Sequence, residues 1–364
     1  MRGSMSAALQ TSQSAGAEVV SPLIDVTTLA FAANVTDCKV LSGGGTAAIA
    51  FGDGSLALID LAGLETDPAA ATRSLALHRV ACTALAPLGQ GVVSAGQDGR
   101  VVVVDGADAV DGRQIFSTDG AWIEALTVHE AAGLVALAVG TGVHVLKPGG
   151  TEVCSADFGS TVTGLCFDRE GKRLAASHYG GVSVIATDTG SVDLRLAWKG
   201  AHIGLTWSPD DRFIVTATQE KELHIWDLAT MEDFRIGGYP RKIHELDWMA
   251  DGLTMACSGA DAITAWPFNA GSPAGRVPVE IGFAFGATVT AVAANPARPL
   301  VAGGFSSGNL LIGAARKGEA VVAAKRTGRP VTALGWSETG DLLVAGDAGG
   351  TVAVCRLPDD LGIT

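Results

Sequence analysis

The residues His244, Glu245 and Asp247 form the densest group of ionisable side chains on any of the inner β-rich segments of this chain. Imidazole and carboxylate groups ligate zinc and carry general acid–base catalysis. One hypothesis is therefore that His244 and Asp247, joined by His202, bind a metal ion or a small ligand. The alternative is a solvated wall with His202 packed in the core. We favour the solvated wall, because every ligand of a zinc ion must lie about 2.0–2.2 Å from the metal.

Motifs that indicate catalysis or cofactor binding are absent from the sequence. It contains no P-loop, no GxGxxG ahead of a helix, no GxSxG, no HExxH and no calcium-binding loop. The glycine runs at 43–45 and 349–350 lie between β-rich segments, which is typical of turns. We therefore expect no cofactor and no enzymatic activity.

A short apolar pattern recurs eight times and organises the whole chain. Each copy begins at an anchor position and has apolar residues three and five places later. The anchors are Val35, Cys82, Ile123, Val162, His202, Ile243, Val289 and Val331. By subtraction, successive anchors lie 39 to 47 residues apart, a spacing typical of four-stranded β-propeller blades.

Counting strands within the units predicts how the ring closes. The last unit ends after its third strand near Leu357, while residues 22–34 form a strand-like segment ahead of the first anchor. We predict an all-β fold: a single closed β-propeller of eight four-stranded blades, with the outer strand of the last blade supplied by the N-terminus. The expected organisation is a flexible segment 1–21, the propeller 22–358 and a tail 359–364.

Several residues carry a resemblance to a known family. Unit five ends its third strand on Trp226-Asp227, and in unit two His78 lies four residues before the anchor, with Asp98 in a later turn. In these features the chain resembles the WD-repeat β-propeller family, as a degenerate, bacterial-type cytoplasmic member. The resemblance implies that His78 and Asp98 are hydrogen-bonded and stiffen their blade.

The position of His78 holds an aromatic residue in five other units. We expect these aromatic side chains to hold their blades by packing. They are Phe31, Phe158, Trp198, Tyr239 and Phe285.

The residues just after the anchors are expected to line a central channel. Most of them are threonine, interrupted by Glu124, Ile203 and His244. Just before the anchors, loops form a rim around the channel mouth. Trp and Arg dominate binding hot spots, so this rim is the better candidate for a protein-binding site. Its predicted residues are Asn34, Trp122, Arg241, Lys242 and Arg329. Trp122 has no role in the repeat, and either binds a partner or caps the channel mouth.

Composition narrows the partners and the compartment. A net charge of −13 argues against nucleic acid, which binds cationic surfaces. One basic segment, 316–329, either docks an acidic partner or protects an outer strand from pairing, and we favour protection. Six cysteines without a CxxC pair, and no apolar run that fits a membrane span or signal peptide, indicate reduced thiols in a cytoplasmic protein. We expect the protein to be a monomer.

Two function classes remain. The first is a non-catalytic scaffold that binds another protein through the rim. The alternative is a propeller that binds a small molecule or metal in its channel, as an enzyme or a metal-handling protein. A fold alone does not separate them, because propellers host both.

Overall fold

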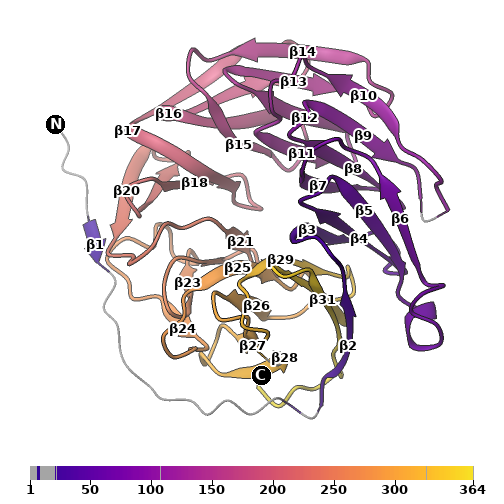
Figure 1. Cartoon of the computed structure of the whole chain (residues 1–364). Helices are drawn as coiled ribbons and strands as arrows, with labels where there is room; N and C mark the ends of the chain where they lie inside the picture. The colour runs from indigo at the N-terminus through magenta and orange to yellow at the C-terminus, as the bar shows by residue number, and fades with distance from the viewer. Residues whose placement is uncertain (1–5, 9–20, 22, 107, 325, 364) are drawn as a thin grey trace.

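The chain forms sheets arranged around a common centre, as Figure 1 shows. The computed structural model describes residues 6–8, 21, 23–106, 108–324 and 326–363. In these ranges the regular structure is β-strand, apart from one turn of 3-10 helix, η1 (Gly63–Glu65). Within the same ranges, no helix has the length and apolar composition needed to cross a bilayer.

Units one, two and three each form one antiparallel sheet, with strands in chain order from the centre outward. Unit one contains β3 (Val35–Val40), β4 (Thr46–Phe51), β5 (Ser55–Asp60) and β6 (Thr72–Ala76). Unit two contains β7 (Cys82–Leu88), β8 (Gly91–Gly96), β9 (Arg100–Val104) and β10 (Arg113–Ser117). Unit three contains β11 (Ala125–His129), β12 (Leu134–Val139), β13 (Gly142–Leu146) and β14 (Glu152–Asp157).

Units four and five share one sheet of seven strands. Its strands are β15 (Val162–Phe167), β16 (Arg173–Ala186), β17 (Val192–Trp207), β18 (Phe213–Thr218), β19 (Leu223–Asp227), β20 (Glu232–Gly237) and, parallel to β20, β1 (Ser6–Ala8). The two units merge because Tyr179 of β16 pairs with Ala201 of β17, so that the ladder of unit four runs on into the inner strand of unit five. The described residues therefore form seven sheets, and the prediction of eight separate four-stranded blades is wrong.

Units six, seven and eight again form four-stranded sheets. Unit six contains β21 (Leu246–Trp248), β22 (Thr254–Cys257), β23 (Ile263–Pro267) and β24 (Val279–Ile281). Unit seven contains β25 (Val289–Ala294), β26 (Leu300–Phe305), β27 (Leu310–Ala314) and β28 (Ala320–Ala324). Unit eight contains β29 (Val331–Trp336), β30 (Leu342–Asp347), β31 (Thr351–Arg356) and β2 (Asp25–Ala30).

The N-terminal strand β2 closes the ring. It pairs antiparallel with β31, from Asp25 opposite Arg356 to Ala30 opposite Thr351, so the outer strand of the last sheet comes from the start of the chain as predicted. The innermost strand of each unit contacts that of the next, and β29 contacts β3. Both ends of the repeat array are therefore held in one sheet, which protects the edge of β31 from other chains.

The core lies between neighbouring units. All residues of the second strands β8 and β18 are buried, because each sheet is covered on both faces by its neighbours. One apolar cluster, for example, joins Val35 and Ile49 of unit one to Val344 and Val352 of unit eight. This packing makes the units a rigid frame for the loops at either end of the ring.

Candidate functional site

The loops at the end of the ring where the inner strands begin are tied together by backbone hydrogen bonds. We call this surface the rim. The Arg241 amide donates to Gly259 O (3.0 Å), and the Val289 amide donates to Ala260 O (2.8 Å). Further round, the Gly328 amide donates to Ser307 O (3.1 Å). The loop of one unit thus holds the link that enters the next, so rim side chains are presented by fixed backbone.

All five predicted protein-binding residues lie exposed on the rim. Trp122 is 58% exposed, although the next residue, Ile123, is buried. Asn34, Arg241, Lys242 and Arg329 are also exposed. The structure does not gather these five at one point, because Trp122 precedes unit three while the three cations precede units six and eight.

Further exposed aromatic side chains lie on the rim, and Tyr179 and Phe285 are the most exposed of them. Tyr179, in β16, is 61% exposed, and Phe285 is 93% exposed. For Phe285 the prediction of packing between blades is wrong, since Ala284, Ala287 and Phe305 fill the space between units six and seven. The sequence signal was the run of glycines around Phe285, which places the chain in a turn.

The predicted blade pair in unit two is present. His78 Nδ1 lies 2.9 Å from Asp98 Oδ1, and His78 Nε2 lies 2.9 Å from Ser94 Oγ. Burial lowers the pKa of His78 below its ordinary value, while Asp98 opposes that shift. Asp98 also accepts the amide of Arg79, so the pair fastens the link between units one and two to the sheet. Its role is structural.

Threonines of the inner strands join neighbouring units. In six inner strands of the described chain the ladder skips the residue after the anchor, which is a β-bulge. The bulge turns that side chain toward the next unit. Thr36 Oγ1 donates to Cys82 O (2.5 Å), Thr290 to Val331 O (2.7 Å) and Thr332 to Val35 O (2.7 Å). Thr163 donates in the same way to His202 O. Four of the five threonines after the anchors are therefore occupied by hydrogen bonds between units, while Thr83 donates within its own unit.

Charged residues of units one and six face each other across the channel. Lys39 Nζ lies 2.7 Å from Asp37 Oδ1, and burial, which lowers the pKa of Lys39, is outweighed by that carboxylate, so its pKa is raised. Burial raises the pKa of Glu245 to about 7 although the side chain reaches water, and Lys39 opposes the shift. Burial likewise raises the pKa of Asp247 to about 6, against the Ala294 amide that it accepts at 2.8 Å.

The candidate metal ligands His244, Asp247 and His202 do not form a metal site in the described residues. His244 and Glu245 precede β21 instead of lying in it, so the inner strand of unit six begins later than the repeat predicts. Their amides bind Ser258 Oγ, each at 3.1 Å. The described residues contain no group of three His, Cys, Asp or Glu side chains placed to hold a metal ion. His202 is buried, with its ring nitrogens bonded to Thr216 and Trp198, and is a core residue as favoured.

A buried histidine in unit five escaped the sequence analysis. His224 stacks on Trp198 at 4.0 Å between ring centroids and lies 4.4 Å from the ring of Trp226. Neither ring nitrogen makes a hydrogen bond, and Asp233 Oδ1 is 3.4 Å from Nε2. Burial, with a smaller effect of His202, lowers the pKa of His224 to about 3. The sequence could have indicated a buried histidine here, because His224 stands among the apolar residues of the third strand of unit five.

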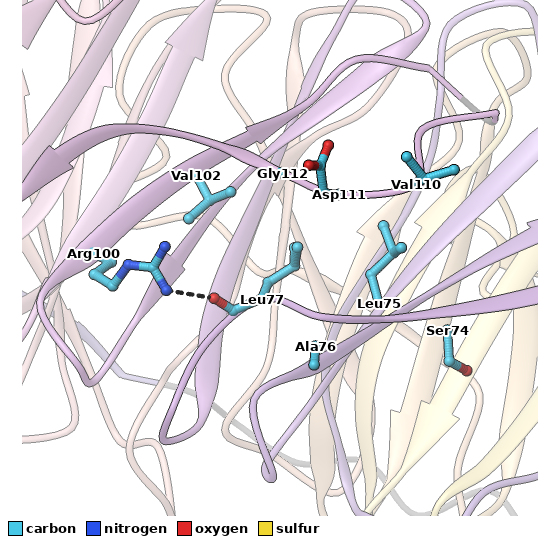
Figure 2. Close-up of a pocket in the computed structure, with 9 residues that line it drawn as sticks. All are labelled: Ser74, Leu75, Ala76, Leu77, Arg100, Val102, Val110, Asp111 and Gly112. Carbon is cyan, nitrogen blue, oxygen red and sulfur yellow. Dashed lines mark hydrogen bonds between the residues drawn. The ribbon is translucent and has the colours of Figure 1, made fainter.

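A groove of about 240 Å³ lies on the outer circumference, between β6 and the loop that joins β9 to β10. Figure 2 shows Arg100 at one end and Val110 at the other. The Arg100 guanidinium already donates to Leu77 O (2.9 Å) and Gln114 Oε1 (2.6 Å). None of the predicted binding residues lines this groove.

The basic segment divides between the two ends of the ring. Arg316 lies in the turn between β27 and β28, and Arg326 and Arg329 lie after β28 on the rim. Lys325, the next candidate in that segment, lies outside the described residues. The segment is therefore not one patch.

The cysteines have the free thiol groups that the sequence predicts. All six are free in the structure, and five are buried. Burial raises the pKa of Cys38, Cys82 and Cys355 to about 12.

Comparisons with known proteins identify the repeat. The family described as "WD domain, G-beta repeat" matches residues 197–227, in unit five. The mouse F-box-like/WD repeat-containing protein TBL1X is 29% identical over 119 residues, which are 32% of this chain and 22% of that protein. The chain thus matches about a fifth of the length of this curated relative.

Solved structures share the fold. The computationally designed Ika8 protein superposes with a TM-score of 0.72 at 19% identity, over 90% of this chain and 98% of the designed one. A chain of the Mitotic Checkpoint Complex superposes with a TM-score of 0.63 at 15% identity, over 76% and 90%. Unit five of this chain therefore matches a WD repeat, and the closed ring of repeated sheets is similar to WD-repeat β-propellers.

Proposed function

We propose that this chain is a non-catalytic scaffold that binds another protein through its rim. The observation that carries the proposal is the exposure of large aromatic side chains, Trp122 above all, on loops whose backbone is fixed by hydrogen bonds. Ordering a flexible loop would cost binding free energy, and a preformed loop avoids that cost. Exposed aromatic and Arg residues on such a surface are typical of protein-binding hot spots.

The relatives support the same function. One curated relative is a WD repeat-containing protein, and one solved neighbour comes from a complex of proteins. The channel supports the alternative less well. Four of its five threonines donate hydrogen bonds to the next unit, and Asp247 accepts a backbone amide of unit seven.

The test compares variants at the two candidate sites in a pull-down from the native cell, followed by titration of the identified partner. The rim variant combines Trp122→Ala, Arg241→Glu and Lys242→Glu, all at exposed positions. Loss of one hot-spot residue typically weakens binding by about 2 kcal/mol, or thirtyfold. The rim variant should therefore lose a partner that the wild type binds.

Two controls make the result specific. His244→Ala with Asp247→Asn changes the channel, and asparagine keeps an oxygen for the Ala294 amide. Val110→Ala with Met231→Ala removes exposed apolar side chains from turns at the opposite end of the ring. Both controls should keep the partner. If the channel variant alone loses a partner or a stoichiometric metal, the scaffold proposal is wrong.

A further inference from the structure

Phe285 lies on the rim between two groups of unpaired cations. It is 93% exposed, while Ala284 and Ala287 beside it are buried. Gly282 and Gly286 have positive φ values of 63° and 70°, and the Ala287 amide donates to Ala284 O at 3.0 Å. This turn directs the two alanines into the core and the phenyl ring into solvent. The exposure of Phe285 is therefore set by backbone geometry.

The cations lie on the rim links on either side of this turn. Arg241 and Lys242 precede unit six, and Arg326 and Arg329 precede unit eight, while Phe285 precedes unit seven. All four cations are exposed, and none forms an ion pair with a described residue. We call Arg241, Lys242, Phe285, Arg326 and Arg329 the aromatic-basic sector.

Hydrogen bonds place the parts of the sector on neighbouring loops. The Arg241 link binds the loop at 259–261, and that loop binds Val289 at the end of the Phe285 turn. The Ser306 amide donates to Thr288 O (2.8 Å), and the Gly328 amide donates to Ser307 O. Two carboxylates lie near the four cations: Asp261, half-buried, within these loops, and Asp347, buried, beside the side chain of Arg329. The sector is therefore a continuous surface with an excess of positive charge.

We propose that the aromatic-basic sector binds an acidic segment of a partner protein, with an apolar side chain of that segment packed on Phe285. The proposal rests on the rim function and names the chemistry of its partner. Four unpaired cations favour carboxylates, and a fully exposed phenyl ring favours an apolar contact. Nucleic acid is disfavoured because the whole chain carries a charge of −13, which repels a long polyanion more than a short acidic segment.

The test uses the full chain and a library of random peptides. Wild type should enrich peptides that combine several Asp or Glu residues with one Phe, Leu or Trp. For the best such peptide, Phe285→Ser should weaken binding about tenfold or more, and so should Arg326→Glu with Arg329→Glu. Binding to the wild type should fall between about 0.05 M and 0.5 M salt, because the cations are exposed to solvent.

Matched variants separate this proposal from the rim function itself. Trp122→Ser removes an exposed aromatic residue elsewhere on the rim, and should leave binding of the peptide within about twofold of wild type. Enrichment of peptides without acidic residues, no enrichment at all, or unchanged binding by Phe285→Ser would each overturn the proposal. So would tighter binding of a single-stranded oligonucleotide than of the peptide. If the Trp122→Ser variant lost a cellular partner that the Phe285→Ser variant kept, binding through the rim would be supported and only the role of the aromatic-basic sector would be refuted.

Discussion

Acidification should destabilise the folded protein through His224, which is buried between Trp198 and Trp226. Its folded pKa of about 3 lies far below the ordinary value of 6.5. Between these values the unfolded chain binds a proton that the folded chain excludes. Stability from this group is therefore complete above about pH 6.5 and falls as the pH decreases toward 3.

The magnitude follows from the size of the shift. Each pKa unit corresponds to about 1.4 kcal/mol, so lowering the pH from 7 to 5 should cost about 2 kcal/mol and full titration about 5 kcal/mol. Glu245 and Asp247 act in the opposite direction, because their raised pKa values favour the folded state as they bind protons. The pH dependence of wild-type stability therefore combines the opposing contributions of His224 and of the two carboxyl groups.

The difference between the wild type and His224→Phe isolates the histidine. Phenylalanine keeps the stacking on Trp198 and removes two buried nitrogens that lack partners. Urea unfolding at pH 7 and pH 5 should show that the variant loses about 2 kcal/mol less than the wild type on acidification. His224→Leu should behave the same way whatever its absolute stability. Equal pH dependence in wild type and both variants would refute the reasoning.

Three further predictions concern the ring. Deleting residues 1–20 should be nearly neutral, whereas deleting 1–33 removes β2, exposes the edge of β31 and should give insoluble protein. Denatured protein kept under reducing conditions should titrate six thiols, and in the native protein the five buried ones should react slowly because burial raises the pKa of the most buried among them. Thr332→Val should lower the free energy of unfolding by about 1–2 kcal/mol, because the carbonyl of Val35 loses its donor.

Each of these has an outcome that contradicts it. A 34–364 chain that melts cooperatively would show that β2 is not needed for closure. A reproducible disulfide would contradict the free thiols. Thr83→Val is the control for Thr332, since Thr83 Oγ1 donates within its own unit, to Ala95 O at 3.2 Å. An equal loss of unfolding free energy in the two variants would mean that the hydrogen bond between units contributes no more than the one within a unit.

The repeat pattern predicted the positions of the inner strands in six of the eight units, because burial between units imposes it on the copies; in units three and six the inner strand begins two and three residues after the anchor. For the same reason the anchor positions Val35, Val162 and Val289 are buried in the structure. The pairing of β2 with β31 was also predictable, since it satisfies polar groups at a strand edge that the fold would otherwise leave unpaired. The pairing of His78 with Asp98 followed from the family resemblance.

The failures arose where local backbone geometry overrides the repeat. The sequence divides the second and third strands of unit four at the glycines 180 and 181, yet the two strands form one continuous strand, β16, that fuses units four and five. Phe285 occupies an aromatic position of the repeat, but positive φ values at Gly282 and Gly286 turn it outward. Stacking around His224 depends on residues from different strands, which spacing along one chain does not reveal.

The bulged threonines determine where the ring opens first. Three of their bonds follow one another from unit seven through eight and one to unit two, and a fourth joins units four and five. Among the described residues, no such threonine bond joins units two to three, three to four, five to six or six to seven, although Asp247 of unit six accepts the Ala294 amide of unit seven. Because β21 of unit six is also only three residues long, local unfolding should begin there, with fast amide exchange. Chain ends usually fray first. Here the strands nearest the two chain ends, β2 and β31, lie in the part of the ring from unit seven to unit two, whose backbone amides should exchange most slowly.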